Sequence, residues 1–278
     1  MGNVRRHGPI VSLVLCALCL VAPASAQQWH PEFEEARATA RDLNRVLLVD
    51  FWADWCGPCR AMDDQSWANP TVRDLSQRFV LARVDFGPKG NYTSEYYDVH
   101  SIPTILVVDR KGACVARLMG FRSAAALQEL LQRLPMRATE LDSLVALAAA
   151  PAPSVDSCVA LAARLNASQL FEPSARLCKQ AQRMLSEAHA DSLDERLALL
   201  DAQNRIPGDP GKGMEALRAC LDRYPTGRYR REQHATMIRA LKGFGAQALA
   251  DSALAKMRQE FPTDSLTHAM ERLVANRR

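Results

Sequence analysis

The sequence predicts an α/β domain with a mixed central sheet flanked by helices, followed by a second domain that is entirely helical. Strand-like and helix-like segments alternate from residue 30 to about residue 135. From about residue 137 onward the chain is rich in Ala, Leu and Arg, and its segments have a helical pattern. Alternating elements favour a sheet covered by helices on both faces, whereas consecutive helical segments favour helix-on-helix packing.

The elements of the first half follow from hydrophobic patterning and from turn residues. Short apolar runs rich in β-branched residues predict strands, and helical periodicity predicts helices. Asn69-Pro70 predicts a break, the segment 109–112 predicts a hairpin turn, and Ser123 predicts a helix N-cap. In chain order we expect a helix at 31–44, a strand at 46–52, a helix from 58, a helix at 71–79, a strand at 80–86, a helix at 92–99, strands at 105–108 and 114–119, and a helix at 123–134.

The second half, residues 137–278, carries a weak internal repeat. The segment 216–226 matches the segment 253–263 at a spacing of 37 residues, since both begin with Ala-Leu and end with an aromatic residue, Pro and Thr. Arrays of helical hairpins have repeats of about 34 residues and more. We therefore predict tetratricopeptide-like helical hairpins. The alternative is a plain helical bundle whose helices happen to end alike.

The N-terminus has the pattern of a secretory signal peptide. Arg5 and Arg6 precede an apolar run from Ile10 to Val21, and small residues stand three and one positions before a cleavage after Ala26. The alternative is a membrane anchor, but a run of about a dozen residues is shorter than the roughly 20 that a span needs. We expect removal of residues 1–26, a periplasmic or secreted mature chain, and no stable membrane insertion after cleavage.

The charge balance indicates no charged partner. Lys and Arg exceed Asp and Glu by four, or by two without Arg5 and Arg6, which is too little to indicate nucleic acid. Six of the eight cysteines remain in the mature chain, where an exported protein can keep disulfides. Six are too few for a disulfide framework in a chain of this length, so an apolar core must stabilise the fold.

The strongest chemical signal is the segment Trp55-Cys56-Gly57-Pro58-Cys59, directly after an apolar strand. A cysteine at a helix N-terminus has a lowered pKa, because unpaired N–H groups and the helix dipole favour the thiolate. Two intervening residues place the second cysteine one turn along, where it can resolve a mixed disulfide. A zinc site is the first alternative, but no second cysteine or histidine pair follows at ligand spacing. A static disulfide is the second alternative.

The segment from Val49 to Arg60 resembles the active-site segment of the thioredoxin family. The stretch 101–104, Ser-Ile-Pro-Thr, resembles the cis-proline loop of that family, and Gly120 resembles its late glycine. The resemblance covers residues 27–136. The stretch 62–72 is more similar to exported thioredoxin-like domains, such as periplasmic thiol:disulfide interchange domains, than to small thioredoxins.

The resemblance implies roles for individual residues. Cys56 would attack the substrate disulfide, Cys59 would resolve the mixed disulfide, and Asp50 would be the buried carboxylate that accepts a proton. The substrate-binding surface would comprise residues beside the cysteines and in the cis-proline loop: Trp55, Gly57, Pro58, Ile102 and Pro103. One departure concerns Arg83, which stands near the position where the family often has Lys. If Arg83 reaches Asp50, its permanent charge would oppose a raised pKa of that carboxyl.

The remaining candidates have ordinary structural interpretations. Cys114 is expected to be a small buried apolar residue of a hairpin strand. Cys158 and Cys178 fall on consecutive predicted helices, so a structural disulfide between them stays open, whereas Cys220 has no obvious mate. The glycine-rich segment 208–213 lacks the Ser/Thr and the preceding strand of a P-loop and is predicted to be a turn between helices.

These observations predict an extracytoplasmic thiol–disulfide oxidoreductase that reduces or exchanges disulfides of exported proteins and needs no cofactor or metal. Its partners would be a disulfide-containing client protein and a membrane thiol electron donor. One alternative is a non-catalytic scaffold in which the helical repeats bind a partner. Another is a disulfide oxidase or isomerase with the same cysteines, because redox direction depends on reduction potential.

Overall fold

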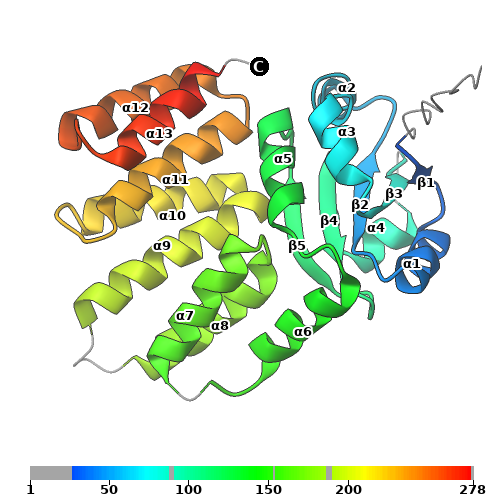
Figure 1. Ribbon diagram of the computed structural model, residues 1–278, viewed down its shortest axis with the longest axis horizontal. Coiled ribbons are helices and arrows are strands. Elements are labelled where there is room, and N and C mark those ends of the chain that lie inside the picture. Colours follow the sequence, from blue (N-terminus) through cyan, green and yellow to red (C-terminus); the bar gives the residue numbers. More distant parts are fainter. Residues whose placement is uncertain (1–26, 88–90, 153, 186–189, 277–278) are drawn as a thin grey trace, which may run out of the picture.

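The computed structural model describes residues 27–87, 91–152, 154–185 and 190–276. The predicted signal peptide, residues 1–26, lies outside this range. In Figure 1 a central sheet with its helices forms one side of the molecule, and stacked helices form the other. Within the described residues no helix is long and apolar enough to span a membrane.

The sheet has five strands in the order β1-β3-β2-β4-β5. Strands β1, β3 and β2 are parallel, whereas β4 is antiparallel to both β2 and β5, so the predicted mixed sheet is confirmed. The sequence analysis missed β1, which is a two-residue edge strand. The strands are β1 (Trp29–His30), β2 (Leu47–Trp52), β3 (Val80–Asp85), β4 (Thr104–Val108) and β5 (Cys114–Met119).

Helices cover both faces of the sheet. One face packs on α1 (Phe33–Asp42) and on the segment that follows α4 (Tyr92–Tyr96). The alternating residues Leu47, Val49 and Phe51 of β2 point to this face. The other face packs on the remaining helices of this half, and Leu48 points to it. These are α2 (Gly57–Met62), the π-helical turn η1 (Asp63–Trp67), α3 (Pro70–Ser76) and α5 (Ala124–Arg133).

Local signals in the sequence explain where these helices begin. The Asn69 side chain accepts hydrogen bonds from Thr71 N and Val72 N, and Pro70 occupies the first turn of α3, where a missing N–H is harmless. Ser123 caps α5 as predicted, through a hydrogen bond from Ala126 N. Helix α4 is shorter than the predicted 92–99, because the chain leaves the helix at Tyr97 and Asp98 has φ 54°.

The second half consists of paired helices. Helix α7 packs on α8, α9 on α10, and α11 on α12, while α13 contacts both α11 and α12. The bounds are α6 (Ala138–Ala149), α7 (Val155–Ala167), α8 (Phe171–Met184), α9 (Ala190–Gly208), α10 (Pro210–Arg223), α11 (Arg230–Gly243), α12 (Gln247–Glu260) and α13 (Ser265–Ala275). The tetratricopeptide-like character of these hairpins stays a prediction.

The repeated segments end in the same way. Helix α10 ends at Tyr224 (φ −122°, ψ 64°) and α12 at Phe261 (φ −134°, ψ 63°). The glycine-rich segment at 208–213 joins α9 to α10 through Asp209 alone, so the predicted turn is present but shorter than expected. Gly213 is required there, because an added Cβ would lie 2.4 Å from the backbone nitrogen of Ile206.

The two halves share apolar contacts. Helices α8 and α9 pack against β5, and one buried cluster runs from the α5 face of the sheet to Leu200 of α9. Polar contacts join the loop after β5 to α11, since Ser123 N donates to Gly243 O at 3.0 Å. The helical half therefore lies against the edge strand β5 and helix α5, as Figure 1 shows. The predicted domain boundary at residues 136 and 137 stays a prediction.

Candidate active site

Cys56 and Cys59 form a disulfide at the N-terminus of α2, directly after β2. Cys56 is the N-cap residue of the helix, and its Sγ accepts a hydrogen bond from Cys59 N at 3.1 Å. Pro58 occupies the first turn, as the sequence predicts. The free N–H groups of a first helical turn stabilise a thiolate at the cap position once the disulfide is reduced.

The residues predicted to bind substrate differ in exposure. Trp55 is 61% exposed, and Gly57 and Pro58 are also exposed. Ile102 is half-buried and packs on the small apolar cluster that contains both cysteines. The Ile102–Pro103 peptide bond is cis, as the resemblance implies, and Gly120 N donates to Pro103 O at 2.8 Å.

An exposed indole and backbone therefore stand beside a nearly buried disulfide. Cys56 is 4% exposed and Cys59 is 2% exposed. The cysteines themselves present little surface, so the exposed surface beside them comes from Trp55, Gly57 and Pro58. The substrate-binding role of these residues stays a prediction.

Asp50 lies on β2, opposite Arg83 of β3 and Ile105 of β4 in the sheet register. The side chain is 2% exposed, and its Oδ1 has no hydrogen-bond partner among the described residues. Burial raises the pKa of Asp50 to about 7, the charge of Arg83 lowers it, and that of Asp63 raises it. A carboxyl with this pKa exchanges a proton near neutral pH, which suits a general acid or base.

Arg83, which stands near the position where the thioredoxin family often has Lys, lies close to Asp50 in the structure. Its Nε lies 3.8 Å from Asp50 Oδ2, while its terminal nitrogen donates to both oxygens of Asp63 at 2.6 Å. The guanidinium also lies 3.9 Å from the ring centre of Trp52 and 5.5 Å from that of Trp29. Arg83 thus lies closer to Asp63 than to Asp50. The pKa of Asp50 is therefore raised more by burial than it is lowered by the charge of Arg83.

The sequence analysis did not identify Asp63 and Trp29 as part of this arrangement. Asp63 begins the π-helical turn that follows α2, and Trp29 belongs to the short edge strand β1. Neither carries a motif. The one signal that could have pointed to them was the expectation that Arg83 lies near the buried Asp50. A partly buried guanidinium is usually stabilised by a further acid or by an aromatic face.

The other four cysteines of the described residues are free thiols: Cys114, Cys158, Cys178 and Cys220. The disulfide between Cys158 and Cys178 that the sequence left open is therefore not formed in this structure. Burial raises the pKa of Cys114 to about 11 and that of Cys178 to about 12. Such thiols are protonated at neutral pH and are poor nucleophiles.

No group of three or more His, Cys, Asp or Glu side chains in the described part of the chain could hold a metal ion. Cys56 and Cys59, the pair that zinc would have required, are bonded to each other.

Comparison with known proteins agrees with this geometry. A family model described as thioredoxin-like matches residues 28–110. The thioredoxin of Bacillus subtilis is 36% identical over 99 residues, which is 34% of this chain and 88% of that protein. The thiol:disulfide interchange protein DsbD of Klebsiella pneumoniae is 28% identical over 149 residues, 45% of this chain but only 25% of that protein.

Among solved structures, a thioredoxin from Thermus thermophilus matches with 27% identity and a TM-score of 0.35, covering 39% of this chain and 87% of that one. The C-terminal domain of DsbD from Neisseria meningitidis, in the reduced form, matches with 24% identity and a TM-score of 0.33, covering 36% and 91%. Sequence and site together show that the chain belongs to the thioredoxin family. It is a thioredoxin-like oxidoreductase with an active-site disulfide between Cys56 and Cys59, followed by a helical region.

Proposed function

We propose that the protein is an exported thiol–disulfide oxidoreductase that reduces or exchanges disulfides of exported client proteins. The observation that supports this proposal most is the disulfide at the start of α2, with a buried carboxyl of pKa about 7 on the preceding strand. The predicted signal peptide and the similarity to DsbD proteins, which are named for thiol:disulfide interchange, support the extracytoplasmic location.

The proposed cycle begins with the reduced enzyme. The Cys56 thiolate attacks one sulfur of the client disulfide, forming a mixed disulfide and releasing the other client sulfur as a thiolate. Cys59 loses its proton to Asp50 and attacks the Cys56 sulfur. The mixed disulfide breaks, the second client thiolate leaves and takes up a proton, and the Cys56–Cys59 disulfide remains. Two electrons have passed to the client.

Another turnover needs two electrons from a donor. We propose a membrane thiol protein as that donor, because a compartment that keeps disulfides does not supply reduced thiols itself. The docking surface for the client would comprise Trp55, Gly57, Pro58, Ile102 and Pro103. The helical half, read as tetratricopeptide-like hairpins, would add contacts to the client or to the donor.

The first test combines activity with trapping. Cys56→Ser should abolish disulfide reduction of an insulin substrate by dithiothreitol-reduced enzyme, a loss of more than about 1000-fold, because the nucleophile is removed. Cys59→Ser should instead accumulate a mixed disulfide with a client, visible on a non-reducing gel. Cys114→Ser is the matched control and should leave both readouts unchanged. Activity that survives in Cys56→Ser would refute the proposed mechanism.

The reduction potential of the Cys56–Cys59 pair tests the direction. A potential of about −270 mV, like that of thioredoxin, supports a reductase, whereas about −120 mV, like that of DsbA, would make the protein a disulfide donor. Equilibration of the oxidised protein with glutathione or dithiothreitol buffers gives this value. A pair that does not titrate reversibly would favour the scaffold alternative.

A further inference from the structure

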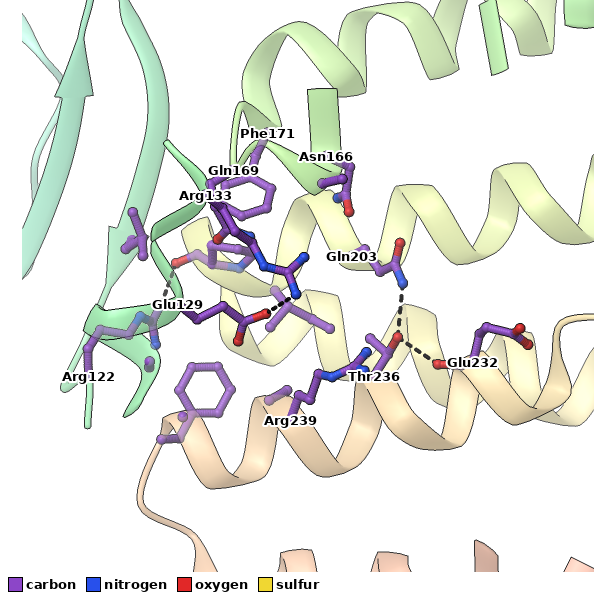
Figure 2. Close-up of a pocket in the computed structure, with 18 of the residues that line it drawn as sticks. Arg122, Glu129, Arg133, Asn166, Gln169, Phe171, Gln203, Glu232, Thr236 and Arg239 are labelled. Atoms are coloured by element: carbon purple, nitrogen blue, oxygen red, sulfur yellow. Dashed lines mark hydrogen bonds and ion pairs between the residues drawn. The ribbon is translucent and has the colours of Figure 1, made fainter. Parts of the chain in front are cut away.

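A cavity of about 360 Å³ lies between the two halves of the molecule. Its walls come from α5 and the preceding loop on one side, and from α7, α8, α9 and α11 on the other. Figure 2 shows side chains from these separate elements pointing toward one another. The lining includes no residue of the Cys56–Cys59 site, so the thiol chemistry does not account for it.

The lining has a surplus of positive charge. Four arginines face two glutamates there: Arg122, Arg133, Arg196 and Arg239 against Glu129 and Glu232. Among the described residues only Arg133 forms an ion pair with one of these carboxylates, at 3.0 Å from Glu129. The cavity therefore holds more guanidinium groups than its own carboxylates neutralise.

Two of the arginines are held by groups that carry no negative charge. Arg122 donates to Pro207 O at 2.8 Å and lies 4.8 Å from the ring centre of Phe244. Arg122 is only 4% exposed, and burial lowers its pKa to about 10, so it stays charged at neutral pH. Arg196 lies 5.0 Å from the ring centre of Tyr229. These contacts fix the guanidinium groups without cancelling their charge.

Arg239 has guanidinium N–H groups that form no ion pair within the described part of the chain. It lies on α11 in the cavity wall that Figure 2 shows, where the charges of Glu129 and Arg133 act on it. The carboxylate of Glu129 is paired with Arg133. Its side chain is exposed, so a ligand from solvent can reach it. An incoming anion would therefore meet Arg239 unpaired and Arg133 with part of its donor set still available.

The rest of the wall supplies hydrogen-bonding and apolar surface. Gln203 donates to the Thr236 hydroxyl at 2.9 Å, which fixes both side chains in the cavity. Phe171 and Ile206 add apolar surface. The wall therefore combines charged and amide side chains with apolar patches, and its volume lies in the range of small-molecule sites, which begins at about 300 Å³.

We propose that this cavity is a binding site for a small organic anion with an apolar body, whose charged group pairs with Arg239 and Arg133. The apolar body would lie against Phe171 and Ile206. A ligand seated there contacts both α5 and the helical half, so it would bind across the two parts of the chain. The site is separate from the redox centre and does not depend on the proposed function.

The probe for this test is 1-anilinonaphthalene-8-sulfonate, an organic anion whose fluorescence rises in apolar sites. N-phenyl-1-naphthylamine, which has the same rings without the sulfonate, is the neutral comparison. The oxidised full-length mature chain should bind one equivalent of the anionic probe, and bind it at least about tenfold more tightly than the neutral one, because ion-paired hydrogen bonds add to apolar contact.

Three variants make the test specific. Arg239→Gln should weaken binding of the anionic probe about tenfold, whereas Glu129→Gln should tighten it several-fold, because a competing carboxylate is removed. Arg218→Gln, an exposed arginine of α10 outside the cavity, is the matched control and should change nothing. Thermal unfolding and insulin reduction should be unaffected in all three.

Other results would overturn the proposal. These are equal affinity for both probes, several equivalents of anion bound, no binding at millimolar probe, or equal weakening in Arg239→Gln and Arg218→Gln. The opposite sign expected for Glu129→Gln keeps the test decisive if Arg239→Gln does not fold.

Discussion

Asp50 in the α/β half and Glu195 in the helical half are buried to the same extent, with 2% and 3% exposure, but their hydrogen bonding differs. Glu195 Oε1 accepts from Tyr229 N at 2.9 Å and from Gln233 Nε2 at 3.0 Å. Asp50 Oδ1 has no partner among the described residues. Burial alone therefore does not distinguish these two carboxylates, whereas the hydrogen bonding of their oxygens does.

The surroundings of Glu195 support its structural role. Its carboxylate fits against Gly227 in the turn between α10 and α11, where an added Cβ would lie 2.2 Å from Oε1. The hydrogen bonds of this carboxylate thus connect α9 to that turn and to α11. Asp50 instead lies on β2, the strand that leads to the active-site disulfide, where the proposed cycle requires a proton acceptor.

The largest expected effect comes from removing the Asp50 charge. Because the folded-state pKa is about 7 against an ordinary 3.8, the folded protein binds this proton more tightly than the unfolded chain. Ionisation therefore destabilises the fold, by about 4 kcal/mol above pH 7 and by nothing below pH 4. Asp50→Asn should be more stable than the original by about 2 to 4 kcal/mol at pH 8 and equal to it near pH 4.

Urea unfolding of the oxidised protein at pH 4 and pH 8 measures this difference. Asp74→Asn, on the exposed side of α3, serves as control and should keep the pH dependence of the original chain. The same Asp50→Asn protein should reduce insulin more slowly if Asp50 accepts the Cys59 proton. A stability difference that does not change between the two pH values would contradict the raised pKa.

Glu195 should behave in the opposite way, since its replacement leaves two donors without a partner. Glu195→Ala should lower the free energy of unfolding by about 2 kcal/mol, the cost of unpaired buried donors, with insulin reduction unchanged. Glu195→Gln keeps an amide oxygen in place of Oε1 and should lose less. Equal losses in the two variants would show that the hydrogen bonds do not stabilise the turn.

The sequence predicted the active-site segment well because its signals are local. The residues that set the geometry of Cys56 and Cys59 lie within one strand-helix junction, and the cis bond at Pro103 followed from a four-residue resemblance. The edge strand β1 was missed because two residues carry no periodicity. The end of α4 was misjudged by a few residues, since tertiary contacts set helix ends.

The sequence could not predict the contacts that join distant segments. The partners of Glu195 lie more than 30 residues away on α11 and the turn before it, and the cavity arginines come from four different segments. Their individual patterns are those of ordinary solvated helix residues, so only the packing of the helices on β5 and α5 brings them together.

The smallest effect tests how the neighbours of Asp50 set its pKa. Arg83→Gln removes the charge that lowers this pKa and should raise it by about one unit, whereas Asp63→Asn removes a charge that raises it and should lower it by about half a unit. Arg83→Lys keeps the charge and should change it little. The carboxyl carbon-13 shift of Asp50 in the oxidised protein, followed against pH, gives all three values. Shifts of the same sign in Arg83→Gln and Asp63→Asn would contradict these charge effects, and no shift in either variant would mean that burial alone sets the pKa of Asp50.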